Sequence, residues 1–223
     1  MFAQLHPINV CVTGNMASGK TTFAHLLATR LSNACFIPEP VEANPFLARY
    51  FVDQQRWGFT AQLRFFADYV QSFEQATSRH AFDCHVIDTG IWTNQAVYTR
   101  YLFDQHIMTE DEYAFYKRLC EDILRAHTMP QADAFIFIDA APSTCWQRMH
   151  QRGWADQVAA VDLDYIETVD NYFQRMKQDL IASDIPVLAL SSESIDFRTS
   201  VGQREALNRA ERFLNSNQLT NPR

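Results

Sequence analysis

Residues 14–21 have the spacing of a phosphate-binding loop. Gly14 and Gly19 stand five positions apart, and Lys20 and Thr21 follow directly. A glycine-rich loop turns several backbone N–H groups toward an anion, and the helix that it opens adds the positive end of its dipole. The lysine would then reach the β- and γ-phosphates of a nucleotide, while the threonine hydroxyl would bind Mg²⁺. We therefore predict that ATP and Mg²⁺ bind here, against Gly14, Asn15, Met16, Ala17, Ser18, Gly19, Lys20, Thr21 and Thr22.

This motif is significant only between a strand and a helix. Residues 8–13 form a short β-branched run, which favours a strand. Over residues 22–31, apolar side chains recur at helical spacing, at Phe23, Leu26 and Leu27 among others. Both conditions hold, so a glycine turn without a ligand is the weaker interpretation.

Carboxylates follow three other apolar runs of the chain. At the ends of parallel strands, such side chains gather at one edge of the sheet, where ligands bind. Glu39, in a loop stiffened by two neighbouring prolines, is predicted to be a general base beside an acceptor hydroxyl, with an exposed loop carboxylate as the alternative. Asp88 is predicted to hold Mg²⁺ through water, with a turn or cap aspartate as the alternative. For Asp139 we expect a structural role in a turn.

Two arginines, Arg148 and Arg152, lie four positions apart on a predicted helix over residues 143–152. Ser143 is the predicted N-cap of this helix, and Gly153 follows its end. An arginine pair before a glycine suits a lid that folds over phosphates and stabilises the transferring group. A solvated basic face is the alternative. The predicted catalytic set is Lys20, Glu39, Arg148 and Arg152.

The elements that must position these groups alternate along the chain. Apolar runs predict five buried strands, over residues 8–13, 35–38, 85–88, 134–139 and 187–190. Segments with helical spacing separate most of these strands. They include residues 45–80, 110–127 and 165–182. This alternation predicts an α/β fold of the P-loop NTPase type: a five-stranded parallel sheet with helices on both faces and a lid.

Composition agrees with one soluble domain, predicted over residues 1–215, with a polar tail over 216–223. The chain has 223 residues, of which 47% are hydrophobic and 20% charged. Its net charge of −7 argues against a nucleic-acid or membrane surface. Its five cysteines show no metal-ligand or redox-pair spacing, and neither a signal peptide nor a long apolar run is recognisable. We therefore expect a cytoplasmic protein.

The motifs taken together resemble the deoxynucleoside kinase family, which includes deoxyadenosine, deoxyguanosine and deoxycytidine kinases. Their joint order and spacing carry the resemblance, which spans nearly the whole chain, and Asn44-Pro45-Phe46-Leu47 looks like the bacterial members. The resemblance implies transfer of the γ-phosphate of ATP to the 5′-hydroxyl of a deoxynucleoside or nucleoside. The matching segments are residues 14–22, 39–47, 56–62, 148–153 and 162–166.

The family's roles pass to matching positions. Glu39 resembles the base that takes the proton from the sugar 5′-hydroxyl, and Gln62 resembles the glutamine that pairs with the nucleobase edge. Arg148 and Arg152 resemble lid arginines near the donor. The family implies a homodimer built on helices, which the apolar stripes over 59–73 and 113–124 would supply. The predicted substrate-binding set is Glu39, Phe51, Trp57, Gln62 and Asn94, although Trp57, like Phe66, suits packing better than base stacking.

The sequence departs from the family on the acceptor side. The third-strand motif, acid-Arg-Ser in the family, is Asp88-Thr89-Gly90, and the lost arginine normally lies beside the base carboxylate and the reacting phosphate. The Asp-Arg pair that usually follows is Asn94-Gln95. A tyrosine that commonly holds the sugar 3′-hydroxyl aligns with Phe51, although Tyr50 is adjacent. If binding is normal, a substitute arginine is expected at Arg64 or Arg100.

Two further departures lie near the predicted lid: Trp154 replaces an arginine, and Gln157 replaces an acid, with Asp156 beside it. These changes leave two alternatives open. One is a kinase for a different small hydroxyl compound, and the other is a nucleotide-binding protein with little catalytic activity. A nucleoside monophosphate kinase would need additional basic residues, and the absence of the third-strand arginine argues against it.

Overall fold

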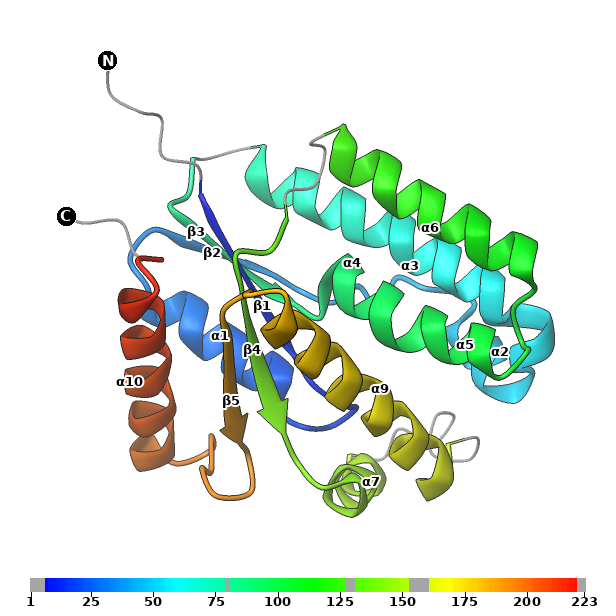
Figure 1. Cartoon of the computed structure of the whole chain (residues 1–223). Helices are drawn as coiled ribbons and strands as arrows, with labels where there is room; N and C mark the ends of the chain where they lie inside the picture. Colours follow the sequence, from blue (N-terminus) through cyan, green and yellow to red (C-terminus); the bar gives the residue numbers. More distant parts are fainter. Residues whose placement is uncertain (1–6, 79–80, 127–130, 153–160, 220–223) are drawn as a thin grey trace.

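A computed structural model describes residues 7–78, 81–126, 131–152 and 161–219 of the chain. One parallel sheet of five strands, in the order β2-β3-β1-β4-β5, forms its centre (Figure 1). Each predicted strand is confirmed to within one residue at either end. Their bounds are β1 Ile8–Thr13, β2 Ala34–Ile37, β3 Cys84–Asp88, β4 Ala134–Asp139 and β5 Val187–Ser191.

Both faces of the sheet are covered by helices, as predicted. On one face, Val10 and Val12 pack with α1 (Lys20–Arg30) and α10 (Ser200–Ser216). On the other, Cys11 packs with a second group of helices, because neighbouring strand residues point to opposite faces. That group includes α4 Gly90–Thr93, the π-helix η1 Asn94–Thr99, α5 Arg100–Asp104, α7 Pro142–Gln151 and α9 Leu163–Ala182.

The predicted helical region over residues 45–80 is two helices, α2 (Leu47–Val52) and α3 (Gln54–Thr77). They are separated at Asp53, whose side chain accepts the N–H of Arg56 and caps α3. An aspartate at this position satisfies a backbone donor that a continuous helix would have paired internally. Residues of both helices line one cavity.

The apolar stripe of α3 packs inside the chain against α6 (Glu110–Arg125) and the β2–β3 edge. Phe66 and Tyr116 meet edge to face with ring centroids 6.0 Å apart. Thr109 and Glu112 form a reciprocal capping box that begins α6. Phe115 of α6 remains 51% exposed. Part of the apolar stripe of α3 and of α6 is therefore buried in the core, whereas the Phe115 ring faces solvent.

The structure corrects two predictions for the connection between β4 and α7. Ser143 is not the N-cap of α7, because the helix begins at Pro142, whose fixed φ suits the first helical position, and Ala141 precedes it. Asp139 has a structural contact, but outside a turn. Its carboxylate accepts from Lys177 of α9 at 2.9 and 3.0 Å, which fastens the end of β4 to that helix.

The five cysteines are free thiols, and all except the half-buried Cys35 are buried. Within the part of the chain that the structure describes, no group of three His, Cys, Asp or Glu side chains suits a metal ion. No helix in the same part is long and apolar enough to cross a membrane. The predicted tail overlaps the end of α10, which reaches Ser216, and residues 220–223 lie outside the described ranges.

Candidate active site

The predicted phosphate loop joins the end of β1 to the start of α1. Gly14 has a φ of 153°, and a Cβ there would stand 2.4 Å from the Ile138 carbonyl oxygen. Gly19, with a φ of 103°, directly precedes the first helical residue, Lys20. The Asn15 side chain donates to the Ile166 carbonyl at 3.0 Å and ties the loop to α9. The loop is thus held in the strand-loop-helix context that phosphate binding requires.

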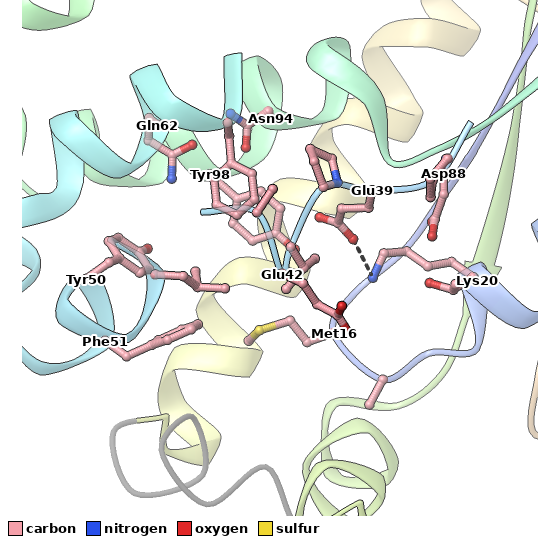
Figure 2. A pocket seen from close by; sticks show the side chains of 18 of the residues that line it. Met16, Lys20, Glu39, Glu42, Tyr50, Phe51, Gln62, Asp88, Asn94 and Tyr98 are labelled. Atoms are coloured by element: carbon pink, nitrogen blue, oxygen red, sulfur yellow. Dashed lines mark ion pairs between the residues drawn. The ribbon is translucent and has the colours of Figure 1, made fainter. Parts of the chain in front are cut away.

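The end of β2 delivers the predicted base to this loop. Lys20 Nζ lies 3.6 Å from Glu39 Oε2, and Figure 2 shows the contact as a dashed line. Both side chains are mostly buried, with 10% and 15% of their surfaces exposed. The other carboxylate oxygen, Oε1, accepts from the Tyr69 hydroxyl at 3.3 Å. Lys20, which was predicted to bind the donor phosphate, is therefore in contact with Glu39, which was predicted to act on the acceptor hydroxyl.

Asp88 lies at the end of β3 in register with Val12 of β1, and 1% of its surface is exposed. Burial raises the pKa of this carboxyl to about 6; Lys20 lowers it, Glu39 raises it, and hydrogen bonding from the Thr21 side chain lowers it. Its Oδ2 is buried without a hydrogen-bond partner in the described ranges. An unpaired carboxylate oxygen near a threonine hydroxyl suits a Mg²⁺ site, as predicted for Thr21 and Asp88.

The raised pKa of Asp88 predicts that this carboxylate destabilises the metal-free protein. Its ionised form is favoured less in the folded state, so the stability present below about pH 4 is lost as the pH rises through 6. The difference from the ordinary value of 3.8 corresponds to about 3 kcal/mol at most. We expect Asp88→Asn to raise the free energy of unfolding by about 1–3 kcal/mol at pH 8 and to change it little at pH 4.

Thermal and denaturant unfolding in EDTA would measure this difference at both pH values. A less stable Asp88→Asn protein at pH 8 would contradict the prediction. It would show that the attraction between the charged carboxylate and the nearby Lys20 stabilises the folded chain despite the burial of Asp88.

The Lys20–Glu39 contact lies at one end of a cavity of about 570 Å³. In the view of Figure 2, Lys20, Glu39 and Asp88 gather at this end, and Gln62 and Tyr50 lie at the other. Its walls come from the phosphate loop, the loop after β2, α2, α3, η1, α7 and α9. The sequence-predicted residues that line it are Met16, Ala17, Lys20, Thr21, Glu39, Phe51, Gln62, Asp88, Asn94 and Arg152.

Trp57, the remaining residue of the predicted substrate-binding set, is placed elsewhere. It is not among the residues that line this cavity. Its ring stacks on Phe46 with centroids 5.6 Å apart, and the guanidinium groups of Arg49 and Arg56 lie 4.9 and 4.4 Å from the ring centre. It therefore packs α3 against α2, as the alternative of a packing residue predicted.

Two amides stand in the cavity away from the phosphate loop. Gln62 is 2% exposed, and its Oε1 has no hydrogen-bond partner in the described ranges. Asn94 is 3% exposed and donates through Nδ2 to the Tyr116 hydroxyl at 2.9 Å. A buried amide oxygen without a partner is costly, so a polar ligand group is its natural complement.

Three tyrosines also line this first cavity, and the sequence did not single out two of them. The hydroxyls of Tyr50 and Tyr165 lie 3.0 Å apart, which brings α2 and α9 together across 115 positions of sequence. Tyr98 also lines the cavity, one helical turn beyond Asn94. That spacing was a signal for Tyr98, whereas the pairing of Tyr50 with Tyr165 has no local signal.

A second cavity, also of about 570 Å³, lies on the other side of the phosphate loop. Arg148 lines it and donates from Nη1 to the Ser18 carbonyl at 3.2 Å and to Ser192 Oγ at 2.8 Å. Arg152 lines both cavities. The two arginines thus lie beside the loop, as a role near the donor requires. Residues 153–160, with Gly153, Trp154, Asp156 and Gln157 and the rest of the predicted lid, lie outside the described ranges.

Neither Arg64 nor Arg100, the expected substitutes for the missing third-strand arginine, lines the first cavity. Arg64 pairs with Asp68 at 2.8 Å on α3, and Arg100 pairs with Asp104 at 2.9 Å on α5. Thr89, which the resemblance aligned with an arginine, is fully buried and has a φ of 67°. Such a backbone is rare outside glycine and clusters at functional sites. Within the described ranges, Lys20 is the cation that pairs with Glu39.

Comparison with known proteins identifies the family. A family model described as deoxynucleoside kinase matches residues 10–215. The chain is 27% identical over 187 residues to a deoxyadenosine/deoxycytidine kinase of Bacillus subtilis, covering 84% of this chain and 83% of the relative. It is 25% identical over 195 residues to human mitochondrial thymidine kinase 2, covering 82% and 70% respectively.

A deoxyguanosine kinase of Bacillus subtilis is 22% identical over 192 residues, with 84% of this chain and 88% of the relative covered. The family model therefore covers the phosphate loop, the residues that line the first cavity and α7. With the family model over almost the whole chain, these findings show that the chain belongs to the deoxynucleoside kinase family.

Proposed function

We propose that this kinase transfers the γ-phosphate of ATP to the 5′-hydroxyl of a deoxynucleoside that lies in the cavity between α2, α3 and α9. The observation that carries this assignment is the contact between Lys20 and Glu39 at 3.6 Å. It joins a phosphate loop to a carboxylate at the end of a cavity lined by amides and tyrosines. Those are the groups needed to position an uncharged nucleoside in line with a phosphoryl donor.

In the proposed reaction, Glu39 accepts the proton of the 5′-hydroxyl as its oxygen bonds to the γ-phosphorus. The bond between that phosphorus and the β–γ bridging oxygen breaks, and ADP leaves with the electron pair. Lys20 neutralises charge on the β- and γ-phosphates, and Arg148 and Arg152 stabilise the transferring group from the side of α7. Thr21 and Asp88 are the residues that would hold Mg²⁺, which would neutralise further phosphate charge.

The polar groups of the cavity suit a nucleoside acceptor. Gln62 Oε1 and the amide of Asn94 are placed to read a nucleobase edge by hydrogen bonds. The Tyr50–Tyr165 hydroxyl pair offers a donor and acceptors for a sugar hydroxyl, in place of the tyrosine that Phe51 has replaced. The cavity lining includes the cations Lys20 and Arg152, but also the acids Glu39, Glu42 and Asp88. This balance favours a neutral acceptor over one that already carries a phosphate.

An ADP-release assay over 2′-deoxynucleosides, ribonucleosides, 2′,3′-dideoxynucleosides and nucleoside monophosphates tests this proposal. We expect turnover with at least one 2′-deoxynucleoside, weaker turnover with its dideoxy analogue, and none with monophosphates. A protein that binds ATP but phosphorylates no nucleoside would contradict the proposal. The substitutions at Thr89, Phe51 and Asn94 make a different small hydroxyl compound the second candidate, which the same assay would then identify from a wider set of alcohols.

We further propose that the enzyme is a cytoplasmic homodimer, built on α3 and α6. Phe115, which is 51% exposed and lies 6.3 Å from Phe59 between ring centroids, places an aromatic ring on the outside of these helices. Light scattering at micromolar concentration should give a mass of twice the 25.8 kDa of one chain. Phe115→Glu should shift the mass toward one chain, whereas a wild-type mass of one chain would contradict the dimer.

A further inference from the structure

The carboxylate of Glu39 is held by two different groups, one at each oxygen. Lys20 Nζ lies 3.6 Å from Oε2, and the Tyr69 hydroxyl donates to Oε1 at 3.3 Å. A carboxylate that is contacted at both oxygens has its plane and rotamer fixed. This orientation matters for a general base, because proton transfer needs hydrogen-bond reach in a narrow range of geometries.

Only one of these two contacts can persist during the proposed reaction. When the phosphates of ATP occupy the loop, Lys20 must turn toward them, since that is the role proposed for it. Its contact with Glu39 then weakens. Within the described ranges, the Tyr69 hydroxyl is the other side chain that hydrogen-bonds to Glu39, and it has no phosphate-binding role to compete with this bond.

Tyr69 is built to remain a hydrogen-bond donor. Its side chain is 2% exposed and absent from the residues that line the cavity, so it approaches Glu39 from the protein interior. Burial raises its pKa well above 10, and the charges of Glu39 and Asp88 raise it further. The phenol therefore keeps its proton at every pH at which the enzyme works, and it cannot take the proton that Glu39 accepts.

The same helix, α3, positions Tyr69 and Gln62, the residue proposed to bind the nucleobase. Gln62 and Tyr69 are seven positions apart on α3, which is two helical turns, so their side chains leave the same face. The ring of Phe65, which lines the cavity, stacks on Tyr69 with centroids 6.2 Å apart. One rigid element thus sets the distance between the nucleobase end and the phosphate end of the acceptor cavity.

We propose that Tyr69 is the positioning residue for Glu39 and that its neutral O–H takes over the orientation of this carboxylate, which the missing third-strand arginine would otherwise contact. The inference rests on the proposed function, because it gives Glu39 the role of base. Arg64 and Arg100 do not take this role, because each is paired with an aspartate on its own helix. A phenol orients the carboxylate without adding a positive charge at this end of the cavity.

Tyr69→Phe tests the proposal by removing one oxygen and leaving the ring in place. With the best acceptor from the ADP-release assay, we expect kcat to fall about 10-fold, the size of one lost hydrogen bond. The KM values for ATP and for the acceptor should stay within about twofold, because Tyr69 touches neither. Tyr101→Phe is the matched control. It removes a hydroxyl of a mostly buried tyrosine that donates to Gln54 at 3.2 Å, and it should leave kcat unchanged.

Repeating the substitution in a Glu39→Gln background separates positioning from general packing. If Tyr69 acts through the carboxylate, the second change should lower the residual kcat less than twofold. An equal 10-fold loss in both backgrounds would reduce Tyr69 to a structural residue and overturn the proposal. So would an unchanged kcat of Tyr69→Phe when Glu39→Gln alone is strongly impaired. If Glu39→Gln alone keeps its activity, Glu39 is not the base and the proposed function fails. That outcome is distinct from a failure of the proposal for Tyr69.

Discussion

Replacing Lys20 by alanine should abolish measurable phosphoryl transfer while the protein stays folded. Lys20 is the cation of the phosphate loop and 8% of its surface is exposed, so the interaction that it makes with phosphate is largely desolvated. Loss of one charged partner in such a site costs on the order of 2–5 kcal/mol. That range corresponds to a reduction of about 30- to 4,000-fold in kcat/KM for ATP.

The experiment combines steady-state kinetics with a direct nucleotide-binding measurement and a circular dichroism spectrum. Lys177→Ala is the matched control, because it removes a lysine of α9 that is also mostly buried and also paired with a carboxylate, that of Asp139, but lines neither cavity. Its activity should stay close to that of the wild type. Unchanged affinity and turnover in Lys20→Ala would remove the phosphate loop from the mechanism.

Glu39→Gln should lower kcat by about 10²–10⁴-fold, the range associated with loss of a general base. The amide keeps the size of the side chain and accepts a hydrogen bond from Tyr69 through its oxygen, but it cannot accept the 5′-hydroxyl proton. Because the change acts on a proton transfer in the transition state, the affinity for ATP should change little. Single-turnover kinetics at saturating acceptor would measure the chemical step directly.

Glu42→Gln provides the comparison for Glu39→Gln. Glu42 lines the same cavity and lies three residues further along the same loop, so it tests the effect of removing any carboxylate there. Its kcat should remain within a few-fold of the wild type. Equal losses in the two variants would mean that cavity charge, rather than a base at position 39, controls the rate.

The phosphate loop and the sheet were predictable because their signals are local. A parallel strand buried on both faces has to be a continuous apolar run, and such runs placed all five strands to within a residue. The loop needs glycine where φ is positive and where a Cβ would strike the Ile138 carbonyl. Since the ends of parallel strands share one edge, the sequence also indicated that Glu39 and Asp88 would lie near Lys20.

The acceptor side was decided by the packing of helices, which no local pattern describes. The bond from Tyr69 to Glu39 spans 30 positions and depends on the rotation of α3 against the loop after β2. The Tyr50–Tyr165 pair spans 115 positions and depends on how α9 lies over α2. The same rotation of α3 turns Gln62 into the cavity and Trp57 onto Phe46. Sequence fixes which side chains a helix carries, but only the packed interior decides which of them face the substrate.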